Sequence, residues 1–152
     1  MMNWTFDILV KSRRIMTDFV DAFSLEDLNK VPENFNNNII WNIGHLVVTQ
    51  QLLTYGLSGL PMLINYDIVD KYKKGSKASG DVTQDEVDTI KSLLIPLIEK
   101  THYDYNNGVF KTFKSYTTST NSTLKTIEEA LEFNNFHEGI HLGYILALKK
   151  SL

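Results

Sequence analysis

With 152 residues, 43% of them hydrophobic, the chain is long enough for one domain with a sizeable core, which we expect to span residues 1–152. Its lack of cysteine excludes disulfides, thiolate catalysis and cysteine-based zinc sites, and it suits a cytoplasmic location. Its net charge of −3 argues against a nucleic-acid partner, and the absence of a signal-peptide pattern or an apolar run of about 18 residues argues against a membrane partner.

The first predicted helix runs from about Asn3 to Ala22. Apolar residues recur there at helical spacing and predict a buried stripe, while the charged residues between them predict a solvated face. The apolar stripe consists of Trp4, Ile8, Ile15, Phe19 and Phe23, with Leu9, Met16 and Val20 beside it. The solvated face consists of Asp7, Lys11, Arg13, Arg14, Asp18 and Asp21. A short capped turn, SLEDL, follows this helix, and Pro32 ends it.

A second helix is predicted from about Ile39 to Leu57, after the polar break NFNNN at residues 34–38. Its apolar positions are three or four residues apart and include His45, so this imidazole is expected to face the core. Gly44 lowers the helix propensity by about 1 kcal/mol relative to alanine. A glycine at such a position indicates that another part of the chain packs closely against it.

Two long connections are predicted, over residues 58–82 and 103–122. The first contains an ambiguous stretch, NYDIVDKYKK, followed by the flexible GSKASGD. Its lysines are interpreted as solvated loop charges and not as a phosphate or nucleic-acid site. They are Lys71, Lys73, Lys74 and Lys77. The second connection is polar with scattered aromatic residues, and we interpret it as a crossover loop, although brief strand pairing is an alternative.

The third helix is predicted over about residues 84–102, because Thr83 and Glu86 form a capping box at its start. Pro96 predicts a kink or break near residues 92–96. Another short helix is then expected to begin at Thr123.

This short helix leads into a final helix over residues 133–150, with a cap or kink at Asn134 and Asn135 between them. The chain therefore has four principal helices and two long connections. Long connections permit parallel neighbours, so the sequence predicts an all-α four-helix bundle that is not a simple up-down-up-down one.

The final helix carries His137 and His141 four residues apart, which places both on one face. The same spacing gives that face six apolar residues. They are Phe133, Phe136, Ile140, Tyr144, Ile145 and Leu148. With His45 on a second core-facing stripe, the pattern predicts a three-histidine site for a divalent metal, because buried imidazoles need partners. Three ordinary hydrogen-bonded core histidines are the alternative, and His102 at a helix end is not expected to be a ligand.

Three neutral imidazoles suit zinc or nickel first, with iron, cobalt or manganese as alternatives, and they leave a coordination position for water or substrate. Glu138 lies about 100° round the helix from His137. We interpret it as a carboxylate that either orients an imidazole or lies on the surface. Tyr144 is predicted to bring its hydroxyl near the metal or to be an ordinary core aromatic. Thr49, one turn after the histidine of the second helix, is a weaker candidate.

Two blocks of this sequence resemble the signature blocks of the DinB-like metal-binding superfamily, also called DinB/YfiT. They are WNIGHLV at residues 41–47 and FHEGIHLGYILALKK at residues 136–150. SYTTS at 115–119 and TIEEALEF at 126–133 resemble the segment that usually precedes the second block. The resemblance runs from the first helix to the C-terminus.

This resemblance implies a bundle with up-down-down-up topology, a divalent metal on His45, His137 and His141, and a homodimer. Some relatives are transferases or isomerases that use mycothiol, bacillithiol or glutathione. The resemblance therefore implies a metal-dependent hydrolase or a thiol-dependent transferase that acts on a small molecule. A low-molecular-weight thiol would then be a second cofactor. A maleylpyruvate isomerase branch has a carboxylate at the position of His137, so that activity does not carry over. The alternative is a non-enzymatic or stress-related bundle with a structural metal.

Overall fold

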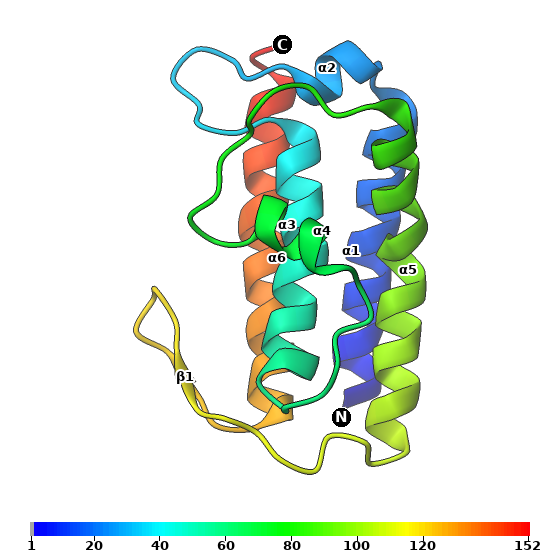
Figure 1. The fold of residues 1–152 in the computed structure, drawn as a ribbon, viewed down its shortest axis with the longest axis vertical. Coiled ribbons are helices and arrows are strands. Elements are labelled where there is room, and N and C mark those ends of the chain that lie inside the picture. The colour runs from blue at the N-terminus through cyan, green and yellow to red at the C-terminus, as the bar shows by residue number, and fades with distance from the viewer. Residues whose placement is uncertain (1) are drawn as a thin grey trace.

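Four long helices form a bundle in the computed structural model, which describes residues 2–152 (Figure 1). They are α1 (Met2–Ala22), α3 (Ile39–Gln51), α5 (Gln84–Asn106) and α6 (Ile127–Lys149). Helices α1 and α6 run in one direction and α3 and α5 in the other, which gives the order up-down-down-up (Figure 1). The predicted all-α four-helix bundle is confirmed. No helix within these residues is long and apolar enough to cross a membrane.

Shorter elements lie between the long helices. They are α2 (Leu25–Asn29), the π-helical turn η1 (Leu52–Gly56) that extends α3, α4 (Tyr66–Tyr72), β1 (Tyr116–Thr117) and β2 (Thr123–Leu124). The two strands pair antiparallel. The ambiguous stretch of the first connection is thus helical at α4, and the alternative of brief strand pairing holds for the second connection.

Side-chain caps determine where the long helices begin. The Asn38, Thr83 and Thr126 side chains each accept a hydrogen bond from a backbone N–H three residues on. This confirms the predicted starts of α3 and α5. The predicted helix start at Thr123 is wrong, because this residue belongs to β2 and Thr126 supplies the cap.

Helix α6 continues without a break where a cap or kink was expected at Asn134 and Asn135. Asn134 Nδ2 donates to Glu138 Oε1 at 3.0 Å, and Asn135 Nδ2 donates to the Thr5 carbonyl of α1 at 3.1 Å. Because both amides find partners beyond their own backbone, they do not compete with the helical hydrogen bonds.

Helix α5 is likewise unbroken at Pro96 and ends at Asn106, four residues later than predicted. A proline inside a helix costs about 3 kcal/mol through its missing N–H and its steric clash. Leu94, Leu97 and Ile98 around it are buried in the bundle. Tertiary packing therefore holds the helix through the proline.

The predicted buried stripe of α1 is wrong at Trp4, Ile8 and Ile15, which are exposed. The buried side chains are instead Thr5, Phe6, Leu9, Arg13, Met16 and Val20. Arg13, expected on the solvated face, is 0% exposed. Similarly, Phe136, Ile140 and Tyr144 of α6 are exposed, although they were predicted to share a buried face with the histidines. In α1, the predicted stripe and the observed buried stripe both have helical spacing. Tertiary packing buries the second one, which includes Arg13.

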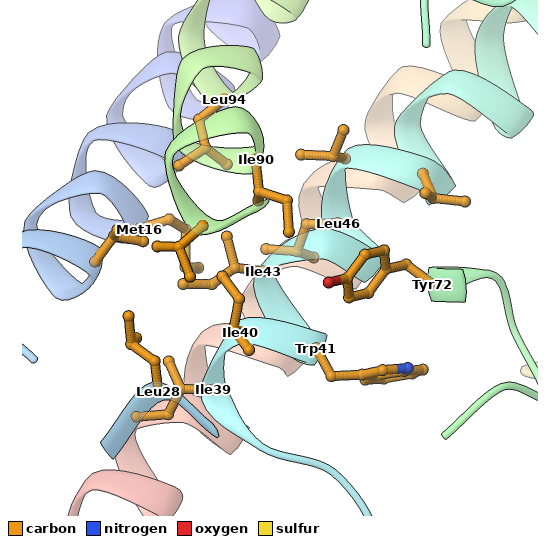
Figure 2. Close-up of a cluster of buried hydrophobic side chains, with 14 of the residues drawn as sticks. Met16, Leu28, Ile39, Ile40, Trp41, Ile43, Leu46, Tyr72, Ile90 and Leu94 are labelled. Carbon is orange, nitrogen blue, oxygen red and sulfur yellow. The ribbon is translucent and has the colours of Figure 1, made fainter. Parts of the chain in front are cut away.

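The main core surrounds α3, of which every residue except Thr49 is buried. Side chains from α1, α3 and α5, among them Met16, Ile43, Ile90 and Leu94, point toward one another there (Figure 2). A helix that is buried on all sides forms the centre of the structure. This central helix carries the first of the three predicted ligands.

Candidate metal centre

The three predicted ligands converge between α3 and α6. One ring nitrogen from each of His45, His137 and His141 lies within 4.8 Å of the other two. The ring centroids are 4.6–5.1 Å apart. His102 lies elsewhere, stacked on Phe6 with centroids 4.2 Å apart. The fold thus brings together the i, i+4 pair of one helix and the single histidine of another, as the sequence predicted.

Hydrogen bonds fix the orientation of two of these rings. His45 Nδ1 lies 2.6 Å from the Tyr72 carbonyl oxygen, and His141 Nδ1 lies 2.7 Å from Asn42 Oδ1. Asn42 Nδ2 donates to the Asn38 carbonyl at 2.8 Å, which identifies Oδ1 as the atom facing the imidazole. Since both partners are acceptors, each Nδ1 carries the proton and each Nε2 keeps its lone pair for a ligand.

The third ring has unused hydrogen-bonding capacity. His137 Nδ1 is buried and has no hydrogen-bond partner among residues 2–152. Buried nitrogens are normally partnered, so this imidazole suits a ligand that the chain does not itself supply. Three imidazoles of this kind fit a borderline divalent metal ion.

Burial lowers the pKa of all three imidazoles. Burial, and then the charges of His141, His45 and Arg13, lower the pKa of His137 to about 3. Burial, and then the charge of His45, lower the pKa of His141 to about 4. Burial also lowers the pKa of His45, although its bond to the Tyr72 carbonyl opposes this effect. All three rings are therefore neutral near pH 7, the state in which an imidazole binds a metal.

The other predicted site residues lie at different distances from the cluster. The Thr49 hydroxyl is 3.3 Å from His45 Nε2. Tyr144 is 55% exposed, with its ring centroid 6.3 Å from that of His141, so it is not an ordinary core aromatic. Glu138 is 1% exposed, so of its two predicted roles the surface carboxylate is excluded.

Glu138 instead forms a buried ion pair with Arg13 of α1. Glu138 Oε1 accepts from Arg13 Nε at 2.9 Å and lies 2.8 Å from Nη2. Arg13 Nη2 also donates to the Leu46 carbonyl of α3 at 3.0 Å. Leu46 follows His45 and Glu138 follows His137 in the sequence. The guanidinium thus joins the two ligand-bearing helices immediately behind the cluster.

Sequence reasoning missed Asn42, the Tyr72 carbonyl and Arg13. Asn42 lies three residues before His45, so its position on the same helix face was a readable signal. Arg13 offered no such signal, because its charge pointed to solvent. The Tyr72 contact is made by a backbone oxygen, which no side-chain pattern reveals.

Gly44 was an indirect sequence signal that a neighbouring segment, here the one with Tyr72, packs against α3. A Cβ at this glycine would lie 2.6–2.8 Å from ring atoms of Tyr72. The prediction that another part of the chain packs closely there is confirmed, with a side chain as the neighbour. The missing side chain of Gly44 lets α4 approach α3 closely enough for the Tyr72 carbonyl to reach His45.

A cavity of about 440 Å³ lies beside the cluster. Its wall combines two of the histidines with apolar side chains, hydroxyl groups and two lysines. These residues are His45, Thr49, Leu52, Leu53, Gly56, Leu57, Lys74, Lys114, Tyr116, Thr118, Ser119, Phe133 and His137. Both long connections contribute to it. The second one is fixed to the end of η1, because the Lys114 N–H donates to the Leu57 carbonyl at 2.7 Å and the Thr112 hydroxyl donates to the Ser58 carbonyl at 2.9 Å.

A family model, that of the DinB superfamily, matches residues 8–145. The match includes all three histidines, Asn42 and Arg13. No curated protein matches the chain.

Proposed function

The chain belongs to the DinB superfamily, and from this premise we propose that it binds one divalent metal ion through His45, His137 and His141 and acts on a small molecule beside that ion. The observation that carries the proposal is the convergence of three neutral imidazoles, two of which have an unprotonated Nε2 because Nδ1 donates its proton to an oxygen acceptor. Superfamily membership and this three-histidine group fit a metal-binding protein.

Zinc and nickel are the proposed metals, ahead of iron, cobalt and manganese, because imidazole nitrogen is a borderline ligand. Three protein ligands are typical of catalytic sites, which keep a position for an exogenous group. Within the described chain, no cysteine, aspartate or glutamate joins the three histidines. The adjacent cavity gives a small molecule room to approach this position.

The proposed reaction is hydrolysis or thiol-dependent transfer. When bound there, a divalent metal supplies a Lewis acid that lowers the pKa of a water or thiol beside it. The chain's own residues bind and orient the substrate: Leu52, Leu53 and Phe133 exclude water from one wall, and the Thr49 hydroxyl offers a hydrogen bond beside His45. Since the chain has no cysteine, a reacting thiol must come from a small molecule.

One observation favours the alternative, a non-enzymatic or stress-related bundle with a structural metal. Among residues 2–152, no aspartate or glutamate lines the cavity to act as a general base. Screening the metal-loaded protein for activity with low-molecular-weight thiols separates the two roles. Turnover with any thiol supports the transferase, whereas no turnover together with a metal that resists exchange supports the structural role.

Metal analysis of the purified protein tests the site itself. We expect about one ion per chain in the wild type and almost none in the His45→Ala and His141→Ala variants, because each removes a ligand. The control is His102→Ala, which changes a histidine outside the cluster and should keep its metal. Equal metal content in all four proteins would contradict the proposed site.

The homodimer expected from the family resemblance is also proposed for this chain. Exposed apolar side chains follow the neighbouring helices α1 and α6. They are Trp4, Ile8 and Ile15 on α1, and Phe136, Ile140 and Tyr144 on α6. We call these six residues the α1–α6 face, and its pairing with a second copy of itself would bury them. The cytoplasmic location remains a prediction.

A further inference from the structure

We propose that the cavity beside the three histidines binds an amphiphilic acid, whose carboxylate or phosphate group lies against Lys74 and Lys114. This inference rests on the proposed function, because it names the class of small molecule that approaches the metal. It follows from the charges, the apolar wall and the arrangement of the lining residues.

The lining of the cavity is cationic, although the chain as a whole is acidic. Lys74 and Lys114 both line the cavity, and no aspartate or glutamate in the described part of the chain does so. The net charge of the chain is −3, so this local excess of positive charge contrasts with the remainder of the surface. A cavity lined by one sign of charge concentrates ligands of the opposite sign.

Neighbouring lysines distinguish the cavity lysines from ordinary loop charges. Lys71 Nζ lies 2.7 Å from Glu86 and Lys73 Nζ lies 2.6 Å from Asp70, so both are neutralised within the chain. Lys74 follows directly, yet no carboxylate of the described residues pairs with it or with Lys114. Lys74 is exposed, in agreement with its prediction as a solvated loop charge, and it also lines the cavity.

The remaining lining residues indicate which groups the ligand has besides its acid group. Leu52, Leu53 and Leu57 from η1 and its end, with Phe133 from α6, make an apolar wall. Thr118 and Ser119 of the second connection add polar groups. A ligand with a charged end and an apolar body matches both parts of this lining, since the apolar body gains from removal of its surface from water.

The exposure of the residues gives the direction in which such a ligand lies. Lys74 and Lys114 are exposed, whereas His45 is buried and His137 is partly buried. The backbone of Lys114 is held in place, because its N–H donates to the Leu57 carbonyl. The acid group therefore lies at the mouth of the cavity, and the apolar body extends toward the histidines.

The test measures binding of four six-carbon probes by calorimetry: hexanoate, hexyl phosphate, hexanol and hexylamine. It is performed on metal-free and on zinc-loaded protein. We expect one or both anions to bind at least tenfold more tightly than hexanol, and hexylamine to bind no better than hexanol. The preferred anion identifies the acid group as carboxylate or phosphate. Binding should persist without metal and weaken with added salt.

Lysine variants separate this proposal from the metal site. Lys74→Met and Lys114→Met should each weaken anion binding by about threefold to tenfold, and the double variant further, while all keep their metal. The matched control is Lys149→Met, which removes an exposed lysine of α6 that does not line the cavity. Equal affinity for hexanoate, hexyl phosphate and hexanol, or unchanged anion affinity in the double variant, would overturn the proposal even if the three histidines bind metal.

Discussion

The Arg13 guanidinium and the Glu138 carboxylate form an ion pair that is almost completely shielded from solvent, with exposed fractions of 0% and 1%. Arg13 also donates to the Leu46 carbonyl, so one side chain of α1 contacts both helices that carry the histidines. Buried pairs of this kind contribute little when whole, but they are costly to break, because the remaining charge keeps no partner.

Arg13→Met should therefore destabilise the protein by about 3–5 kcal/mol in urea unfolding. The double variant Arg13→Met with Glu138→Leu should recover most of this loss, because no unpaired charge remains. We expect its metal affinity to stay below that of the wild type, since the contact with the Leu46 carbonyl is still missing. A single variant as stable as the wild type would contradict the buried pair.

Asn42→Leu should weaken metal binding by about 10–100-fold, as measured by competition with a chelator of known affinity. The reason is that Asn42 Oδ1 accepts the Nδ1 proton of His141 and so sets the orientation of that ring. Asn42→Asp serves as the comparison, because it retains an acceptor for the His141 Nδ1 proton and should keep metal binding, while the lost donor to the Asn38 carbonyl should lower its stability. If both variants bind metal as tightly as the wild type, the hydrogen bond does not orient the ligand.

Gly44→Ala should lower both stability and metal affinity. Alanine improves helix propensity by about 1 kcal/mol, but its Cβ would lie 2.6 Å from the Tyr72 ring, and such overpacking costs about 1–3 kcal/mol. Displacement of Tyr72 would also move the carbonyl that holds His45.

Gly139→Ala provides the matched control within α6. Apart from its chain neighbours and the adjacent backbone of α6, no atom of the described residues would lie within 4 Å of a Cβ there. This variant should therefore gain up to about 1 kcal/mol and keep its metal. Thermal unfolding with and without metal distinguishes the two glycines, and equal effects of both substitutions would exclude a special role for the Tyr72 contact.

The metal-free protein should lose stability as the pH falls from about 6.5 toward 4. The folded protein holds the pKa of His141 at about 4 and that of His137 at about 3, whereas an unfolded histidine titrates near 6.5. In this window the unfolded state binds more protons, so acid favours unfolding, by at most about 1.4 kcal/mol per pH unit for each histidine.

Urea unfolding at a series of pH values measures this effect. His137→Leu removes one of the titrating groups, so the pH dependence of its unfolding free energy should be less steep than that of the wild type. An identical dependence in the two proteins would show that His137 is not held neutral by the fold.

The α1–α6 face should control the oligomeric state in analytical ultracentrifugation. Ile8→Lys with Ile140→Lys should convert a dimer into a monomer, because each copy would then bring charges into an apolar interface. Leu63→Lys changes an equally exposed leucine outside this face and should leave the dimer intact. A wild-type protein that sediments as a monomer would remove the basis for this interface.

Local sequence signals were sufficient for the bundle and for the three histidines. The pair His137 and His141 is readable from helical geometry alone, and the caps at Asn38 and Thr83 fix their helix starts through contacts three residues away. Helix caps and i, i+4 pairs depend on residues that are close in the sequence, so they can be predicted without knowledge of the tertiary structure.

The features that could not be predicted depend on tertiary partners. The burial of Arg13 requires Glu138, which is 125 residues away. The exposed apolar stripe of α1 has the same periodicity as the buried one, so spacing alone does not identify the face that turns inward. The Tyr72 contact involves a backbone atom, and it depends on the packing of α4 against α3, which the sequence pattern does not show.

The cavity draws its wall from two kinds of structure. His45 and His137 belong to the long helices α3 and α6, whereas Lys74, Lys114, Thr118 and Ser119 belong to connections outside these helices. Hydrogen bonds from Thr112 and Lys114 fasten the second connection to the end of η1, and the Phe110 ring of this connection packs against the Tyr55 ring of η1 with centroids 5.1 Å apart. We therefore expect exchange of this loop for one of different length or charge to change which small molecule the cavity accepts, while the three histidines of α3 and α6 keep their positions.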